Sequence, residues 1–176
     1  SMGDGSQANN PWLQELPDPV SKVTWDNYAM ISPEMAKSLL GLDIYNNQKQ
    51  ADSYEVTPEK PVIKITANGK TIELPALILP GVHPSTVAIA VGYGRESANK
   101  EQTMDRIGRS ANGAGKNAFV LAGFDGNSVL NTAVITAEKT NATYPLAQTQ
   151  VHGSSENRPV IYETTLTVSR LRLPRP

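Results

Sequence analysis

The stretch from Pro61 to Arg95, PVIKITANGKTIELPALILPGVHPSTVAIAVGYGR, decides the fold class. Apolar and polar residues alternate over 63–68 and again over 71–76, which is the pattern of half-buried strands. Asn68-Gly69 separates the two runs and favours the positive φ angles of a two-residue hairpin turn. A third run, residues 87–91, pairs large with small apolar side chains and predicts a strand buried on both faces. It leads into Gly92-Tyr93-Gly94-Arg95, a loop whose glycines allow the backbone to approach a ligand closely.

The residues before this stretch predict one helix and one strand. Ser32-Pro33-Glu34 combines an N-cap hydroxyl, a proline at the first helical position and an acid in the first turn, and Gly41 ends the helix. A strand is predicted over Lys22–Tyr28. Three prolines in Asn10–Pro19 favour an extended strap anchored by its apolar residues, and 43–60 is expected to be an irregular, exposed excursion.

The residues after the stretch add further strands. A short apolar run covers Ala118–Leu121, and a turn covers Gly123–Asn127. Alternation predicts a strand over Val129–Ala137, a weaker one over Tyr144–Val151 and a strong one over Val160–Val168. Six or more strands with one clear helix indicate a mainly β domain with a closed or nearly closed sheet.

Composition excludes several classes of function. The chain has 176 residues and a net charge of −1, so it lacks the basic surface typical of nucleic-acid binding. It has no cysteine, which rules out disulfides, thiolate metal sites and a cysteine nucleophile in these residues. No apolar run reaches the roughly 18 residues of a membrane span, so direct membrane insertion is not expected.

The local motifs do not define an enzyme. Gly92-Tyr93-Gly94 lacks the third glycine and the βαβ context of a dinucleotide fingerprint. Gly113-Ala114-Gly115-Lys116 lacks the spacing and the hydroxyl residue of a P-loop. His83 and His152 are too few for a metal site, and no G-x-S-x-G elbow is present. We therefore expect this domain to perform no catalysis alone.

Several segments together resemble the C-terminal dinucleotide-binding domain of molybdopterin oxidoreductases. They are, in order, the helix Ser32–Leu42, the hairpin Ile65–Pro75, the segment Pro80–Val87, the loop Gly92–Gly94 and the segment Gly115–Ala118. The resemblance covers about 9–168 in scattered blocks. It implies a closed six-stranded double-psi β-barrel with one or two short helices.

Other segments resemble, more closely, the iron–sulfur subunit family of bacterial alternative complex III. They are Asn10–Pro19 with Lys22–Tyr28, and Pro145–His152 with Arg158-Pro159-Val160. That family is a fused relative of the molybdopterin oxidoreductases and belongs to a respiratory quinol-oxidising complex. The resemblance implies Tat export, a position on the periplasmic side of the inner membrane, and partners among other domains of a parent chain and subunits of a membrane complex.

The resemblance also implies a candidate cofactor site. Molybdopterin guanine dinucleotide would be held largely by backbone N–H groups beside glycines. The matching positions are Gly92, Tyr93, Gly94, Asn117, Gln150 and His152. Iron–sulfur clusters would belong only to a part of the parent protein outside this sequence.

Two departures leave alternatives open. Val91 stands where catalytic members carry histidine, and Gly153 follows His152 where close relatives carry a second histidine. The domain is therefore interpreted as a structural one whose cofactor site is degenerate. The alternatives are a functional cofactor-binding domain of an active molybdenum or tungsten enzyme, and an unrelated β-barrel interaction module.

The same resemblance implies the domain boundaries. Residues 1–9 are expected to be a tag remnant and disordered linker, 10–168 the barrel domain, and 169–176 a tail leading to an iron–sulfur domain of the parent. The polar start and basic finish are typical of a piece of a longer protein.

Overall fold

The computed structural model describes residues 5–8, 10–96 and 112–151. Within them a five-stranded mixed sheet carries the fold, with strand order β4-β1-β3-β2-β7, and a separate two-stranded sheet pairs β5 with β6. The strands are β1 (Ala29–Ile31), β2 (Glu59–Ala67), β3 (Lys70–Ile78), β4 (Ala88–Ile89), β5 (Gly123–Phe124), β6 (Val129–Leu130) and β7 (Thr136–Pro145). The helices are α1 (Pro11–Glu15), α2 (Pro33–Met35), the π-helix η1 (Ala36–Leu40), α3 (Gln48–Val56) and the 3₁₀-helix η2 (Ala118–Leu121).

The hairpin of β2 and β3 forms the centre of the sheet, as predicted. Ala67 pairs with Lys70 across a two-residue turn, in which Asn68 and Gly69 have φ angles of 51° and 72°. The alternation is also confirmed, because Ile63 and Ile65 are fully buried. The second half of β3 is buried on both faces, so the sheet is covered on both sides at this point.

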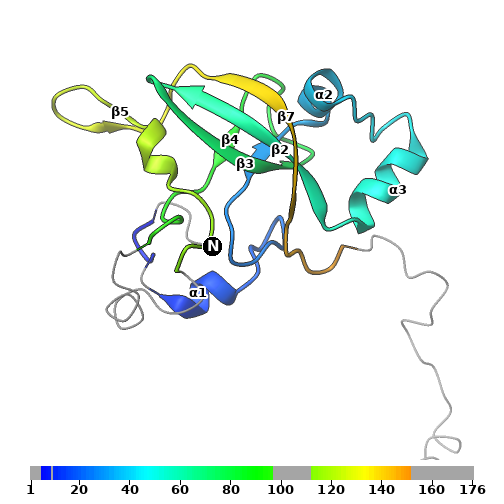
Figure 1. The fold of residues 1–176 in the computed structure, drawn as a ribbon, viewed down its shortest axis with the longest axis horizontal. Coiled ribbons are helices and arrows are strands. Elements are labelled where there is room, and N and C mark those ends of the chain that lie inside the picture. Colours follow the sequence, from blue (N-terminus) through cyan, green and yellow to red (C-terminus); the bar gives the residue numbers. More distant parts are fainter. Residues whose placement is uncertain (1–4, 9, 97–111, 152–176) are drawn as a thin grey trace, which may run out of the picture.

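Local signals also define the helical turn after β1. The Ser32 side chain accepts a hydrogen bond from Met35 N at 3.0 Å, and Pro33 occupies the first turn. The turn continues as η1 and ends at Gly41, whose φ is 73°. Ala36 and Leu40 join the main apolar core on one face of the sheet. In Figure 1, α2 and α3 lie at one end of the sheet, and the β5 hairpin projects from the other.

The prediction of a closed barrel is wrong. Among the described residues the sheet is open, with β4 and β7 at its two edges. Closure requires the edge strands to pair, but β4 has only two residues. The carbonyl of Ala90 accepts a hydrogen bond from Asn27 Nδ2, and Gly92 turns the chain with a φ of 92°. The strand predicted over Val160–Val168 lies outside the described residues.

Several other predicted elements differ as well. Lys22–Tyr28 is not a strand, since Lys22 and Trp25 have positive φ angles, and only Val23 forms an isolated bridge, to Gln148. The strap over Asn10–Pro19 contains α1, because Asn10 caps it and Pro11 occupies the first turn. Trp12, a predicted anchor, is 80% exposed.

The remaining differences concern helices and strand limits. The excursion over 43–60 contains α3, which Asn47 caps, and the apolar run Ala118–Leu121 forms η2. The first two residues of the turn predicted over Gly123–Asn127 form the strand β5. The strand predicted over Val129–Ala137 divides into β6 and the start of β7, which runs on to Pro145.

Candidate functional site

The predicted loop follows β4 and packs against a second glycine-containing segment. The Gly94 N–H donates to Ala114 O at 2.8 Å, and the Gly113 N–H donates to Arg95 O at 3.0 Å. A Cβ added at Gly94 would lie 2.7 Å from Lys116 Cα, and closer still to the Asn117 backbone nitrogen. The structure therefore brings Gly94 and Asn117 together, and it leaves no space between them.

Gly92 is covered from another side. A Cβ added there would lie 2.7 Å from Gly5 Cα and 3.3 Å from Ala8 Cβ. The Arg95 guanidinium donates to the Ala8 carbonyl. Residues 5–8 thus pack on the loop, and Gly92 is buried.

The Asp26-Asn27 pair joins the two glycine segments. Asp26 Oδ1 accepts from the Gly115 N–H and Asn27 Oδ1 from the Lys116 N–H, both at 2.8 Å. Asn27 Nδ2 donates to the carbonyls of Ala90 and Lys116, both at 2.9 Å. Asn27 is 1% exposed. We refer to Gly92–Arg95, Gly113–Asn117 and Asp26-Asn27 together as the glycine junction.

Asp26 and Asn27 were not predicted from the sequence as site residues. Their signal was the Asp-Asn dipeptide itself, whose side chains readily bond to backbone groups. Tyr144 adds a further contact, since its hydroxyl donates to Asp26 Oδ2 at 2.9 Å. Burial, and then this bond to a carboxylate, raise the pKa of Tyr144 to about 12.

Of the other predicted site residues, Asn117 belongs to the glycine junction through its backbone, whereas its side chain has a separate role. Asn117 Oδ1 accepts from Phe119 N at 3.1 Å and so caps η2. Gln150 is exposed, and its neighbour Thr149 bonds to the Lys22 carbonyl rather than to the glycine junction. His152 lies outside the described residues.

Tyr93 extends from the glycine junction to a cavity of about 240 Å³. Its walls come from the N-terminal segment, from β1 and the residues before it, and from β4 and the residues after it. They comprise Gln14, Leu16, Asp18, Val23, Tyr28, Met30, Ala88, Ile89, Ala90 and Tyr93. This N-terminal cavity is mainly apolar.

A buried lysine lies near the start of β2, against the C-terminal end of α3. Lys60 is 1% exposed, and its Nζ donates to the carbonyls of Tyr54 and Thr57 at the end of α3. It also lies 4.3 Å from the centre of the Tyr54 ring. Burial lowers the pKa of Lys60. These contacts cap the helix C-terminus and give the lysine a structural role.

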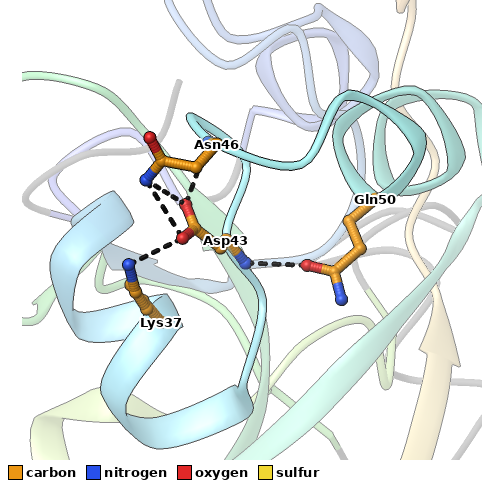
Figure 2. A network of polar contacts seen from close by, with 4 residues as sticks. All are labelled: Lys37, Asp43, Asn46 and Gln50. Atoms are coloured by element: carbon orange, nitrogen blue, oxygen red, sulfur yellow. Dashed lines mark hydrogen bonds and ion pairs between the residues drawn. The ribbon is translucent and has the colours of Figure 1, made fainter.

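A polar network near α3 has a similar role (Figure 2). Asp43 accepts from Lys37 Nζ at 2.6 Å and from Asn46, and its own N–H donates to Gln50 Oε1 at 2.9 Å. The Lys37 hydrogen bond, followed by those of Asn46, lowers the pKa of Asp43 to about 2. The network ties η1 to α3, and its members already satisfy one another.

Comparisons with known proteins do not assign a family. No family model matches the chain, and no curated protein gives a significant match. In the part of the chain that the structure describes, no group of three or more histidine, cysteine or acidic residues could hold a metal ion. None of the described helices is long and apolar enough to span a bilayer.

Proposed function

We propose that this chain is a non-catalytic scaffold domain of a molybdopterin oxidoreductase-like subunit in a respiratory quinol-oxidising complex. Its role is to brace neighbouring domains and subunits. Its place is on the periplasmic side of the inner membrane, without insertion into the bilayer. The sequence resemblance supplies the family, and the glycine junction supports the loss of the cofactor.

One observation carries the proposal. An anion-binding loop needs backbone N–H groups directed at the ligand. In the glycine junction, the Gly115 N–H is directed at the Asp26 carboxylate, and the Lys116 N–H at the Asn27 amide oxygen. The protein's own acceptors occupy these donors, and a carboxylate repels phosphate.

The close backbone packing supports the same conclusion. Gly92 contacts Gly5, and Gly94 contacts Lys116 and Asn117. In a cofactor site, glycine makes room for a ligand, whereas here it makes room for other backbone segments. Close backbone packing and positive φ angles therefore account for Gly92 and Gly94 without a ligand.

Cofactor retention in cells tests the proposal. The chain would be produced in a host that synthesises molybdopterin guanine dinucleotide, purified, and assayed for molybdenum by mass spectrometry and for pterin by fluorescence. We expect neither in stoichiometric amount. Stoichiometric pterin would refute the degenerate site and favour a domain of an active molybdenum or tungsten enzyme.

A direct titration adds a second test. Calorimetry with molybdopterin guanine dinucleotide, and with GDP as a fragment of it, is expected to give no binding heat. The variant Asp26→Asn provides the matched comparison, because it removes the repelling charge and keeps an acceptor for the Gly115 N–H. If the unmodified chain binds either ligand, and Asp26→Asn binds it with the same affinity, the Asp26 carboxylate does not repel phosphate. That result would contradict our account of the glycine junction.

A further inference from the structure

We propose that residues 170–176, which lie outside the described part of the chain, dock on an exposed face of α1 in the same molecule. The face consists of Trp12, Glu15 and Leu16, and we call it the α1 face. This contact does not depend on the scaffold function, because it joins two segments of one chain and neither belongs to the glycine junction.

The α1 face presents apolar side chains to solvent. Residues three and four apart are neighbours on a helix, so Trp12, Glu15 and Leu16 lie on one side of α1. Trp12 is 80% exposed and Leu16 is 57% exposed, whereas Gln14, on the opposite side, is 2% exposed. This arrangement reverses the usual amphipathic pattern of a surface helix, and tryptophan is enriched at the centres of binding surfaces. The α1 face therefore has the character of a surface that a partner covers.

Glu15 gives this face a negative charge. The side chain is exposed and forms no ion pair with any described residue. Residues 10–21 contain no lysine or arginine. The other acid of this segment, Asp18, accepts hydrogen bonds from the N–H groups of Val20 and Ser21 in its own turn. The charge of Glu15 therefore favours a cationic partner.

The N-terminal cavity lies beside the α1 face, because Leu16 is exposed and also lines the cavity. Its walls include the apolar side chains of Val23, Met30 and Ile89. A volume of about 240 Å³ exceeds the roughly 150 Å³ that accommodates benzene in a protein interior. The cavity therefore has room for one leucine side chain of a partner bound to the α1 face.

Residues 170–176 supply the groups that this surface requires. Their sequence, Arg170-Leu171-Arg172-Leu173-Pro174-Arg175-Pro176, alternates arginine with leucine and then with proline. An arginine side chain can pair with the Glu15 carboxylate and stack on the Trp12 ring, and a leucine can enter the cavity. The prolines disfavour a helix, and extended proline-containing segments commonly dock on aromatic surfaces.

The described chain ends close to this surface. The Thr149 N–H donates to the Lys22 carbonyl at 2.9 Å, and Gln148 Nε2 donates to the Ser21 carbonyl at 2.7 Å. The residues between Val151 and Arg170 can span up to roughly 60 Å when extended, so residues 170–176 can reach the α1 face. Tethering gives a segment an effective concentration on the order of 1 mM, so a weak contact is enough to hold it in place.

A spin label next to the segment tests the contact on the whole chain. The sequence has no cysteine, so Ser169→Cys provides a single site for a nitroxide. We expect ¹H–¹⁵N NMR to show broadened amides at Trp12, Glu15 and Leu16 relative to the same chain with the nitroxide reduced. The Phe124 amide is the remote reference, because β5 lies apart from α1 in Figure 1. Broadening that is absent from the α1 face, or equal at Phe124, would overturn the proposal.

Charge variants test the specificity of the contact. Glu15→Lys is expected to reduce the broadening of the Leu16 amide by half or more, and glutamates at the three arginine positions of residues 170–176 should restore it. Glu34→Lys, a matched change at an exposed acid on α2, should leave it unchanged. Equal effects of Glu15→Lys and Glu34→Lys would overturn the assignment to the α1 face.

Apolar variants test the tryptophan and the cavity. Trp12→Ala removes an exposed ring, and Leu171→Ser with Leu173→Ser removes the side chains assigned to the cavity. Both are expected to reduce the broadening of the Leu16 amide by half or more. Broadening unchanged by either variant would overturn the part assigned to that group.

A mixed sample distinguishes one molecule from two. A ¹⁵N-labelled chain without the nitroxide would be mixed with a spin-labelled chain at natural isotope abundance, each at about 0.1 mM, well below the effective concentration of a tethered segment. We expect no broadening of the Trp12 and Leu16 amides. Broadening as strong as in the single spin-labelled chain would show that residues 170–176 dock on a second copy, and would overturn the contact within one chain.

Discussion

Replacing Gly94 with alanine tests the glycine junction directly. Gly94 has a φ of 68°, where a side chain costs about 1–2 kcal/mol. The added Cβ would lie 2.7 Å from Lys116 Cα, whereas carbon atoms prefer about 3.5–4.0 Å. Since the obstructing atoms are backbone, no rotamer change relieves the clash, and the segment 114–117 must move.

That movement sets the size of the effect. It disrupts the bond from Gly94 N to Ala114 O and the bond from Lys116 N to Asn27 Oδ1. Each is worth about 1 kcal/mol. Together with the conformational cost, Gly94→Ala should lower the free energy of unfolding by about 3–4 kcal/mol. This is a large share of the roughly 5–15 kcal/mol of a typical domain.

Gly113→Ala is the matched control. Gly113 lies in the same junction and has a φ of 73°, but a Cβ there meets nothing within 4 Å. It should lose only the conformational part, about 1–2 kcal/mol. Urea unfolding followed by far-ultraviolet circular dichroism measures both variants, provided that their m-values agree. Equal losses, within about 0.5 kcal/mol, would show that the junction is open in solution and would refute the packing argument.

Three further predictions concern single side chains. Lys37→Met should raise the pKa of Asp43 from about 2 towards 3.8, as measured by carboxyl NMR titration. Because the folded pKa is the lower one, Asp43 stabilises the protein above pH 3.8 and loses this effect as the pH falls towards 2. Burial raises the pKa of Tyr28 from 10.0 to about 12, so stability should fall as the pH rises from 10 to 12, and Tyr28→Phe should reduce this fall in urea midpoints. Ser32→Ala removes the cap bond to Met35 and should cost about 1 kcal/mol in urea unfolding.

Each of these predictions has a result that would contradict it. An Asp43 pKa unaffected by Lys37→Met would show that the ion pair in Figure 2 does not persist in solution. An alkaline profile unchanged in Tyr28→Phe would mean that Tyr28 is not buried. Ser38→Ala is the control for the cap, since Ser38 lies exposed in η1, where its hydroxyl donates to the Met35 carbonyl but caps no helix N-terminus; equal losses for both serines would remove the capping argument.

The elements that were correctly predicted from sequence are those fixed by neighbouring residues. Asn68-Gly69 sets the hairpin turn by its own φ preferences, and the alternation around it sets which faces are buried. Ser32 and Gly41 likewise mark the two ends of a helical turn. In each case the deciding contacts join residues only a few positions apart.

The incorrect predictions concern elements whose structure depends on contacts between distant residues, or whose side chains are exposed to solvent. α3 has no buried residue, so no apolar stripe marked it, although its cap Asn47 was a usable signal. The polar side chains of β7 lie at a sheet edge, so alternation could not fix its limits. Closure of the sheet depends on which strands pair, and strand patterns alone do not determine the partner.

The glycine junction shows the same limit for the site. The sequence indicated that the glycines of Gly92-Tyr93-Gly94 allow the backbone to approach a ligand closely. In the structure, other backbone segments lie against Gly92 and Gly94, which the sequence did not indicate. That arrangement depends on Asp26 and Asn27, which hydrogen-bond to Gly115 and Lys116, 89 residues further along the chain.

The pairing of the two ends of the described chain affects how this protein can fold during synthesis. Val23 bridges to Gln148, and Gln148 Nε2 bonds to the Ser21 carbonyl 127 residues away. Such distant pairings form slowly, since the entropy of closing a long loop is lost before the contact can stabilise the chain. The segment around Ser21 and Val23 is synthesised before Gln148 but gains this partner last. The central hairpin, with its local turn, is therefore the natural starting point of folding, and the N-terminal segment docks in a late step that a truncated, ribosome-bound chain cannot complete.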